Sequence, residues 1–312
     1  MSDLHWLSAS DAVRAFAARR LSPVELVQAL LARIDALDPS LNVFIRRDDT
    51  AALAAARVAE AEIAAGRIRG PLHGVPVGIK DIIDVAGLPT TCHSRVLLDN
   101  HASTDAVCVA RLRQAGAIVL GKLSTHEFAI GGPSFDLPFP PARNPWNRDH
   151  HPGGSIRNPA SACGIVGLKP TYGLVSRRGV FPLAFTLDHV GPMTRTVADN
   201  ALLLDTLAGH DPQDPGSRAA PKRYHAAGLE RGVRGLRIGF VRHFHQADLI
   251  ADPDVDAALE AVARSFTADG AIVSDVTLPT LGEFAAFQAS PANARAYGVG
   301  WRGGRHRADR HG

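Results

Sequence analysis

The feature that most constrains the fold of this chain is an alternation of amphipathic helical segments with short apolar segments. Ser22-Pro23-Val24-Glu25 has the pattern of a capping box with proline at the first helical position. Apolar residues follow it at three- and four-residue spacing as far as Leu37, and Pro39 is expected to end this helix. Further helices are predicted over residues 51–65, 104–115, 197–208 and 254–269.

The short apolar segments between these helices have the length and composition of buried strands. They cover residues 74–81, 117–120, 236–241 and 271–276. Strands that alternate with helices favour an α/β sheet covered on both faces. Residues 131–160, rich in glycine, proline and asparagine, are expected to form a loop. A loop of this length inside a compact domain is either functional or damaged.

Composition excludes several classes of protein. Of 312 residues, 46% are hydrophobic and 21% charged, which excludes a disordered chain, a collagen-like repeat and a disulfide scaffold. The three cysteines form no C-x-x-C pair, so we expect neither a zinc site nor a redox pair, and no cofactor. The sequence shows no signal peptide and no apolar run of about 18 residues. We therefore expect a soluble cytoplasmic protein that does not contact a membrane.

The formal net charge of +3 is unevenly distributed along the chain. Residues 290–312 contain five arginines and one aspartate, without helix or strand periodicity. We expect this segment to be a basic, unstructured tail, and its alternative is a basic arm for nucleic acid or anionic surfaces. Only Tyr297 and Trp301 could stack on bases there, which argues against nucleic acid as a partner.

Lys80 and Ser155 are the strongest candidates for catalytic residues. Lys80 follows a buried apolar run, and burial favours a neutral amine that can act as a general base. Ser155 follows Gly153 and Gly154, whose backbone N–H groups could form an oxyanion hole beside a nucleophile. Each residue alone also fits a simpler interpretation, an exposed charge and a tight turn. The adjacent His150-His151 pair lacks companion ligands and is expected on a surface loop.

Five segments together resemble the amidase signature family. The resemblance is carried, in the family's order, by Gly74–Asp81, Arg143–Asn147, Gly153–Ala160, Gly164–Gly173 and Asp188–Arg195. It extends from about residue 5 to residue 288. It implies an α/β fold with one large mixed β-sheet wrapped by helices, incomplete in this chain. It also implies hydrolysis of a carboxamide to carboxylate and ammonia through an acyl-serine intermediate.

The resemblance also implies roles for individual residues. Lys80 matches the catalytic lysine, Ser155 the nucleophile, and Gly153 and Gly154 the oxyanion-hole donors. No cofactor is implied. The implied partner is a small-molecule amide, and a homodimer or assembly with amidotransferase subunits is left open. Neither a membrane nor nucleic acid is expected as a partner.

The chain departs from the family where a second, bridging serine in a cis peptide is expected. The family has two Gly-Gly-Ser segments, whereas this chain runs from the start of the first directly into the continuation of the second, at about 155/156. The bridging serine therefore has no counterpart, and Ser155 can descend from either copy. We expect an amidase-signature domain over 1–289 with this internal deletion, followed by a non-homologous tail over 290–312.

Two functions follow from this departure. The first is an amidase impaired by loss of the bridging serine. The second is a role as a subunit: either a catalytically inactive relative that acts in binding or assembly, or the amidase-type subunit of a tRNA-dependent amidotransferase. Residues 131–136 are expected to border the acyl pocket.

Overall fold

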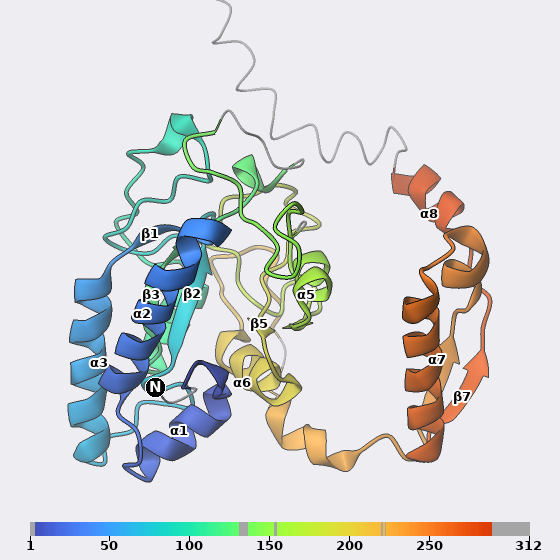
Figure 1. Ribbon diagram of the computed structural model, residues 1–312, viewed down its shortest axis with the longest axis horizontal. Helices are drawn as coiled ribbons and strands as arrows, with labels where there is room; N and C mark the ends of the chain where they lie inside the picture. Colours follow the sequence, from blue (N-terminus) through green and yellow to red (C-terminus); the bar gives the residue numbers. More distant parts are fainter. Residues whose placement is uncertain (1–3, 131–136, 153–154, 220, 222, 289–312) are drawn as a thin grey trace, which may run out of the picture. The chain divides into compact units, whose positions relative to one another are not determined.

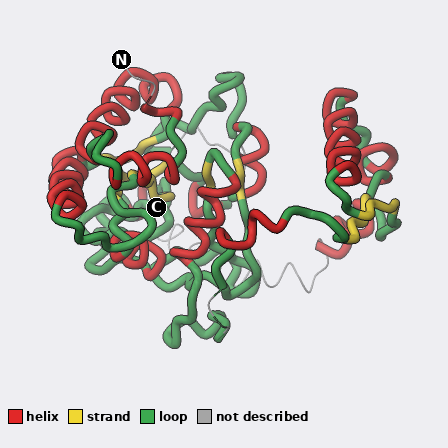
Figure 2. The backbone as a smooth tube through the Cα atoms, turned by 90° about the horizontal axis from the view of Figure 1, so that it is seen from below, coloured by secondary structure: helices red, strands yellow, loops and turns green. Residues whose placement is uncertain are grey.

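The computed structural model describes residues 4–130, 137–152, 155–219, 221 and 223–288. By its internal contacts the chain divides into two compact units, Met1–Ala226 and Ala227–Gly312. Most elements of the two units are labelled in Figure 1, and Figure 2 colours the backbone by secondary structure. The expected domain over 1–289 stays a prediction, and the expected tail lies outside the described residues.

The first unit is built around a mixed three-stranded sheet in the order β1-β3-β2, in which β1 is antiparallel and β2 parallel to β3. A separate antiparallel pair joins β4 and β5. The strands of this unit are β1 (Phe44–Arg47), β2 (Pro76–Lys80), β3 (Ile118–Leu123), β4 (Val166–Gly167) and β5 (Met193–Thr194). Its helices are α1 (Ala9–Ala17), α2 (Pro23–Leu41), α3 (Asp49–Ala64), α4 (Val107–Gln114), α5 (Arg157–Cys163) and α6 (Val197–Leu207).

Helices cover both faces of the three-stranded sheet, as the alternating pattern predicts. On one face, Ile118 and Leu120 of β3 pack in a buried cluster with α2 and α3, which lie beside the sheet in Figure 1. On the other face, Val77 and Val119 pack in the cluster formed with α4 and α6. Burying apolar side chains on both faces contributes about 25 cal/mol per Å² of area removed from water.

A bulge in β3 changes which face of the sheet the following residues occupy. Val77 is paired with Val119, but Gly78 is paired with Gly121, so β3 contains one residue more than β2 over this stretch. Only glycine fits at the bulge, because a Cβ on Gly121 would lie 2.2 Å from the Arg46 carbonyl oxygen. The extra residue pairs Lys122 with Ile79. Lys122 therefore lies on the face of the sheet opposite to that of Ile118 and Leu120.

The helix starts agree with their sequence signals, and one predicted helix end is wrong. Ser22 and Glu25 form the capping box of α2, and the Thr196 side chain caps α6 by accepting from the Asp199 N–H. However, α2 continues past Pro39 to Leu41 and ends at Asn42, which is left-handed at φ 54°. A proline this close to the end removes one helical hydrogen bond, which the remaining turn tolerates because Asn42 N–H still reaches the Asp38 carbonyl oxygen.

The second unit contains a parallel pair of strands, β6 (Arg237–Phe240) and β7 (Ile272–Asp275), joined through α7 (Pro253–Ala268). The helix α8 (Leu281–Gln288) follows. These elements confirm the strand–helix–strand pattern predicted between residues 236 and 276, while α8 is an additional element. No helix within the described parts of either unit is long and apolar enough to cross a membrane.

Candidate active site

The structure brings together the two residues that the sequence singles out. Lys80 is the last residue of β2, and its Nζ lies 3.5 Å from Ser155 Oγ. Ser155 precedes α5 by two residues, and the described residues 137–152 before it contain neither helix nor strand. The helix α5 begins at Arg157, so the predicted loop over 131–160 is wrong over its last four residues. Gly153, Gly154 and residues 131–136 lie outside the described residues, so their expected roles stay predictions.

The Lys80 amine is partly buried, with a consequence for its charge. Burial lowers the pKa of Lys80 below its ordinary value of 10.5, and the nearby Cys92 thiol acts in the opposite direction. Burial also raises the pKa of Cys92 to about 12, so this thiol stays protonated and is a poor nucleophile. A lysine with a lowered pKa exists more often as the neutral amine, the form that can accept a proton from a serine hydroxyl.

Asp81, the residue after Lys80, takes part in a buried ion pair. Lys122 Nζ is 3.1 Å from Asp81 Oδ1, away from the line of a hydrogen bond, and both side chains have an exposed fraction of 0%. Lys122 also donates to Thr90 Oγ1 at 2.9 Å and to the Pro89 carbonyl oxygen at 3.2 Å. The bulge at Gly121 makes this contact available, because it places Lys122 on the face that Asp81 occupies. Burial lowers the pKa of Lys122, and Asp81 opposes that change.

The same aspartate fixes a strained turn beside the site. The Asp81 carboxylate accepts from the backbone N–H groups of Thr91 at 3.1 Å and His93 at 3.4 Å, and from the Thr91 hydroxyl. Cys92 and His93 have positive φ angles of 51° and 57°, which non-glycine residues adopt at a cost of about 1–3 kcal/mol each. These hydrogen bonds to a buried charge therefore hold the turn in place beneath Lys80.

Two residues of the Arg143–Asn147 motif anchor α5, which follows Ser155. Asn144 Nδ2 donates to the Ala162 carbonyl oxygen at 2.9 Å, and Trp146 Nε1 donates to the Cys163 carbonyl oxygen at 3.1 Å. These carbonyls belong to the last turn of the helix, where no helical donor is available. Gly167 lets β4 approach α5 closely, because a Cβ there would lie 2.5 Å from Ala160 Cβ.

A pair of histidines connects the two sides of the site. His126 Nε2 and His151 Nδ1 are 3.2 Å apart, and their ring centroids are separated by 4.5 Å. Burial lowers the pKa of His151 to about 4, with further contributions from His126, His93 and Arg143. The two histidines of the predicted surface loop therefore differ in exposure: His150 is exposed, whereas His151 is half-buried. Side chains at consecutive positions face different directions, which the sequence pair alone cannot resolve.

Sequence reasoning missed the Asp81–Lys122 pair, the histidine pair and the anchoring role of Asn144. A signal existed for the first, since a lysine inside an otherwise apolar strand requires a buried partner. No group of histidine, cysteine, aspartate or glutamate side chains among the described residues is arranged to hold a metal ion. All three cysteines are free thiols.

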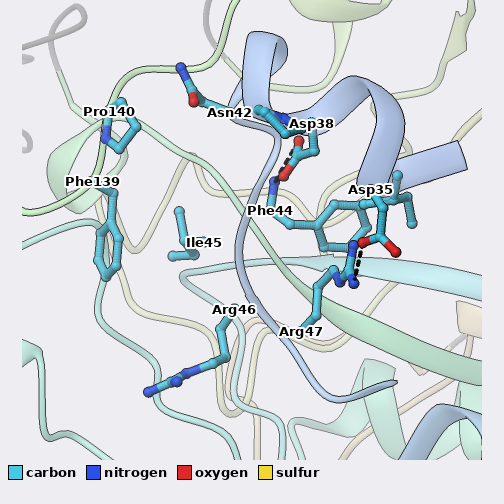
Figure 3. A pocket seen from close by; sticks show the side chains of 11 residues that line it. Asp35, Asp38, Asn42, Phe44, Ile45, Arg46, Arg47, Phe139 and Pro140 are labelled. Carbon is cyan, nitrogen blue, oxygen red and sulfur yellow. Dashed lines mark hydrogen bonds and ion pairs between the residues drawn. The ribbon is translucent and has the colours of Figure 1, made fainter. Parts of the chain in front are cut away.

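A hollow of about 430 Å³ lies away from this site, between the end of α2, β1 and residues 139–140 (Figure 3). Its acidic residues are already engaged: Asp35 pairs with Arg47 at 2.7 Å, and Asp38 accepts from the Phe44 N–H. Neither Lys80 nor Ser155 lines it. The hollow therefore has no direct part in the chemistry of the lysine–serine pair.

Comparison with known proteins places these residues in a family context. The family model named Amidase matches residues 25–155 and 153–299. The two matches overlap at 153–155, so the same Gly-Gly-Ser ends the first match and begins the second. The second match continues ten residues beyond the last residue of the expected domain.

Individual relatives agree with this assignment. The chain is 43% identical over 285 residues to the glutamyl-tRNA(Gln) amidotransferase A subunit of Geobacter metallireducens, covering 84% of this chain and 58% of the relative. A peptide amidase from Stenotrophomonas maltophilia has a similar structure, with a TM-score of 0.81, 35% identity and coverage of 90% of this chain and 64% of that one. A bacterial aryl acylamidase of the amidase signature family gives a TM-score of 0.82 at 28% identity, covering 96% and 66%.

These similarities confirm the predicted α/β fold class. The chain spans about 58% of the length of the Geobacter relative that it matches. The family model covers most of the chain in two consecutive ranges, and the motifs around Lys80 and Ser155 lie inside them. The chain therefore belongs to the amidase signature family.

Proposed function

We propose that this protein hydrolyses a carboxamide to a carboxylate and ammonia through an acyl-serine intermediate. The observation that carries the proposal is the 3.5 Å separation of Lys80 Nζ from Ser155 Oγ, at the end of β2, where burial lowers the pKa of the lysine. A hydroxyl beside a neutral amine is the arrangement that activates a serine nucleophile.

The reaction can be written with these two side chains. The neutral Lys80 amine takes the Ser155 hydroxyl proton while Oγ bonds to the amide carbon. The Lys80 ammonium then gives this proton to the amide nitrogen as the carbon–nitrogen bond breaks, so that the nitrogen leaves as ammonia. Water attacks the acyl-serine ester with Lys80 again acting as the base, which releases the carboxylate and restores the serine. Gly153 and Gly154 are expected to donate backbone N–H groups to the oxyanion.

We further propose that this activity is impaired by loss of the bridging serine. The overlap of the two family matches at 153–155 supports the fusion of two Gly-Gly-Ser segments. The lysine–serine distance of 3.5 Å is longer than the 2.6–3.2 Å typical of a base and the nucleophile it activates. Direct proton transfer over this distance requires the two side chains to approach each other first.

Ammonia release from a panel of aliphatic and aryl carboxamides tests the proposal. We expect slow release by the full chain, lost in Ser155→Ala and Lys80→Met and retained in the matched control Ser161→Ala, an exposed serine of α5. The rate should rise with pH, following deprotonation of an amine with a pKa below 10.5. Absence of ammonia from the unmodified chain, or equal release by Ser155→Ala, would refute the proposal.

A second candidate function is supported by the relative from Geobacter metallireducens, which is the A subunit of a glutamyl-tRNA(Gln) amidotransferase. In this case the chain would bind the remaining subunits of such an enzyme, with or without activity of its own. Co-expression with those subunits, followed by size-exclusion chromatography, tests this function. A stable complex containing an inactive chain would favour it over free amide hydrolysis.

A further inference from the structure

The two residues of the candidate site, Lys80 and Ser155, lie on different kinds of segment. Lys80 ends β2 and is paired with Leu123, the last residue of β3. Ser155 belongs to the segment between residue 137 and α5, which contains neither helix nor strand in its described part. The lysine is thus fixed by the sheet, whereas the serine needs other contacts to hold it near the lysine.

The histidine pair supplies such a contact. His126 lies three residues after the end of β3, and His151 lies four residues before Ser155. Their 3.2 Å contact therefore joins the sheet edge that carries the lysine to the segment that carries the serine. A hydrogen bond between two imidazoles requires one protonated and one unprotonated ring nitrogen, which neutral rings provide.

The surroundings of His151 favour a neutral ring. His151 is partly buried, and among the described residues three basic groups lower its pKa further: His126 from the segment after β3, His93 from the turn that Asp81 holds, and Arg143 from the segment before α5. The guanidinium of Arg143, which is charged at neutral pH, would repel a protonated His151, so burial and Arg143 together favour the uncharged, hydrogen-bonded form of His151.

We propose that His126 and His151 are positioning residues that hold the Ser155 segment against the sheet edge bearing Lys80. The inference deepens the proposed function and rests on it for the role of Ser155. Neither imidazole is a catalytic residue, because both act through the backbone that leads to the serine or the lysine. Positioning within about 1 Å affects reaction rate strongly, so loss of the link should slow turnover more than substrate binding.

Hydrogen exchange tests the link without depending on activity. In the full chain, His126→Ala and His151→Ala should each increase exchange about three- to tenfold across residues 147–152 and 155–160. Exchange in α2 should remain unchanged, which excludes general unfolding. His150→Ala is the matched control, since His150 is the exposed neighbour of His151, and it should leave all of these rates unchanged.

Conservative variants sharpen the test. His126→Gln places an amide near the Nε2 position and His151→Asn places one near the Nδ1 position, so each should restore part of the protection. Combining His126→Ala with His151→Ala should add little to either alone, because both remove the same contact. In ammonia-release assays, the alanine variants should lower kcat about tenfold with KM within about twofold.

The outcomes separate this inference from the proposed function. Increased exchange that reaches residues 155–160 supports the link, even if the unmodified chain releases no ammonia and the proposed function fails. Unchanged exchange, an increase confined to 147–152, or an equal effect of His150→Ala overturns the link, whatever the ammonia assay shows.

Discussion

Replacing Lys122 by methionine should strongly destabilise the first unit of this protein. The substitution keeps most of the side-chain volume but removes the charge that lies 3.1 Å from Asp81, in a place where both side chains are fully buried. Removing one partner of a buried ion pair typically costs about 3–5 kcal/mol, because the other charge remains without its counterion. Against a total stability of about 5–15 kcal/mol, this loss is large.

Not all of the Asp81 stabilisation is lost in this variant. Three donors from Thr91 and His93 still reach the carboxylate, so we expect a loss of about 3 kcal/mol, near the lower end of the range. Adding Asp81→Asn removes the unpaired charge and should recover at least half of the loss. The double variant therefore separates the cost of an isolated charge from the cost of altered packing.

Urea unfolding followed by tryptophan fluorescence measures this prediction. Trp6 and Trp146 lie in the first unit, and Trp301→Phe in the background removes the third tryptophan. The midpoint should shift at constant m-value, which indicates that the same surface becomes exposed. A loss below about 1 kcal/mol for Lys122→Met, or no recovery in the double variant, would refute the reasoning.

Three further predictions concern the segment around Ser155. Lowering the pH from 6.5 to 4 should reduce the free energy of unfolding by up to about 3 kcal/mol. With the pKa of His151 at about 4, the folded protein binds fewer protons than the unfolded chain between these two pH values. His151→Gln should therefore flatten the dependence of the urea midpoint on pH. Asn144→Ala should lower the free energy of unfolding in urea by about 1–3 kcal/mol, because it removes a buried hydrogen-bond donor to the end of α5. Trp146→Phe should lower it less, because Trp146 is exposed. Gly167→Ala should lower the thermal midpoint, with a cost of about 1–3 kcal/mol from the clash with Ala160, while the control Gly228→Ala, which meets open space, should change it little.

The local signals in the sequence predict the helices α2, α3, α4, α6 and α7 and the strands β2, β3, β6 and β7, because those signals act over a few residues, whereas α1, α5 and α8 are not predicted. Capping by Ser22 and Thr196 depends only on the first turn of each helix, and the strand before Lys80 needs only an apolar run. The strand β1, in contrast, reads Phe-Ile-Arg-Arg and lacks alternation. Its pairing with β3 provides the hydrogen bonds that its own sequence does not indicate.

The sequence predicts the two reactive residues of the candidate site, but it does not predict the contacts that position them. Lys80 and Ser155 are 75 residues apart, and their proximity follows from the family motifs rather than from any local pattern. The Asp81–Lys122 contact depends on a bulge that a single glycine permits, and a glycine in a strand has several other meanings. The contact between His126 and His151 depends on a segment without periodicity, where sequence gives no direction to side chains.

The bulge at Gly121 also determines how the two sides of the site respond to changes in chain length. Deleting one residue of β3 near the bulge would return Lys122 to the opposite face of the sheet and leave Asp81 buried without its counterion. The segment before Ser155 has no such register, so insertions there change its reach without reversing any side chain. We therefore expect functional sequences of this kind to keep the length of Ile118–Leu123 constant, and to vary in length over residues 137–142 rather than in the part that contains Asn144 and His151.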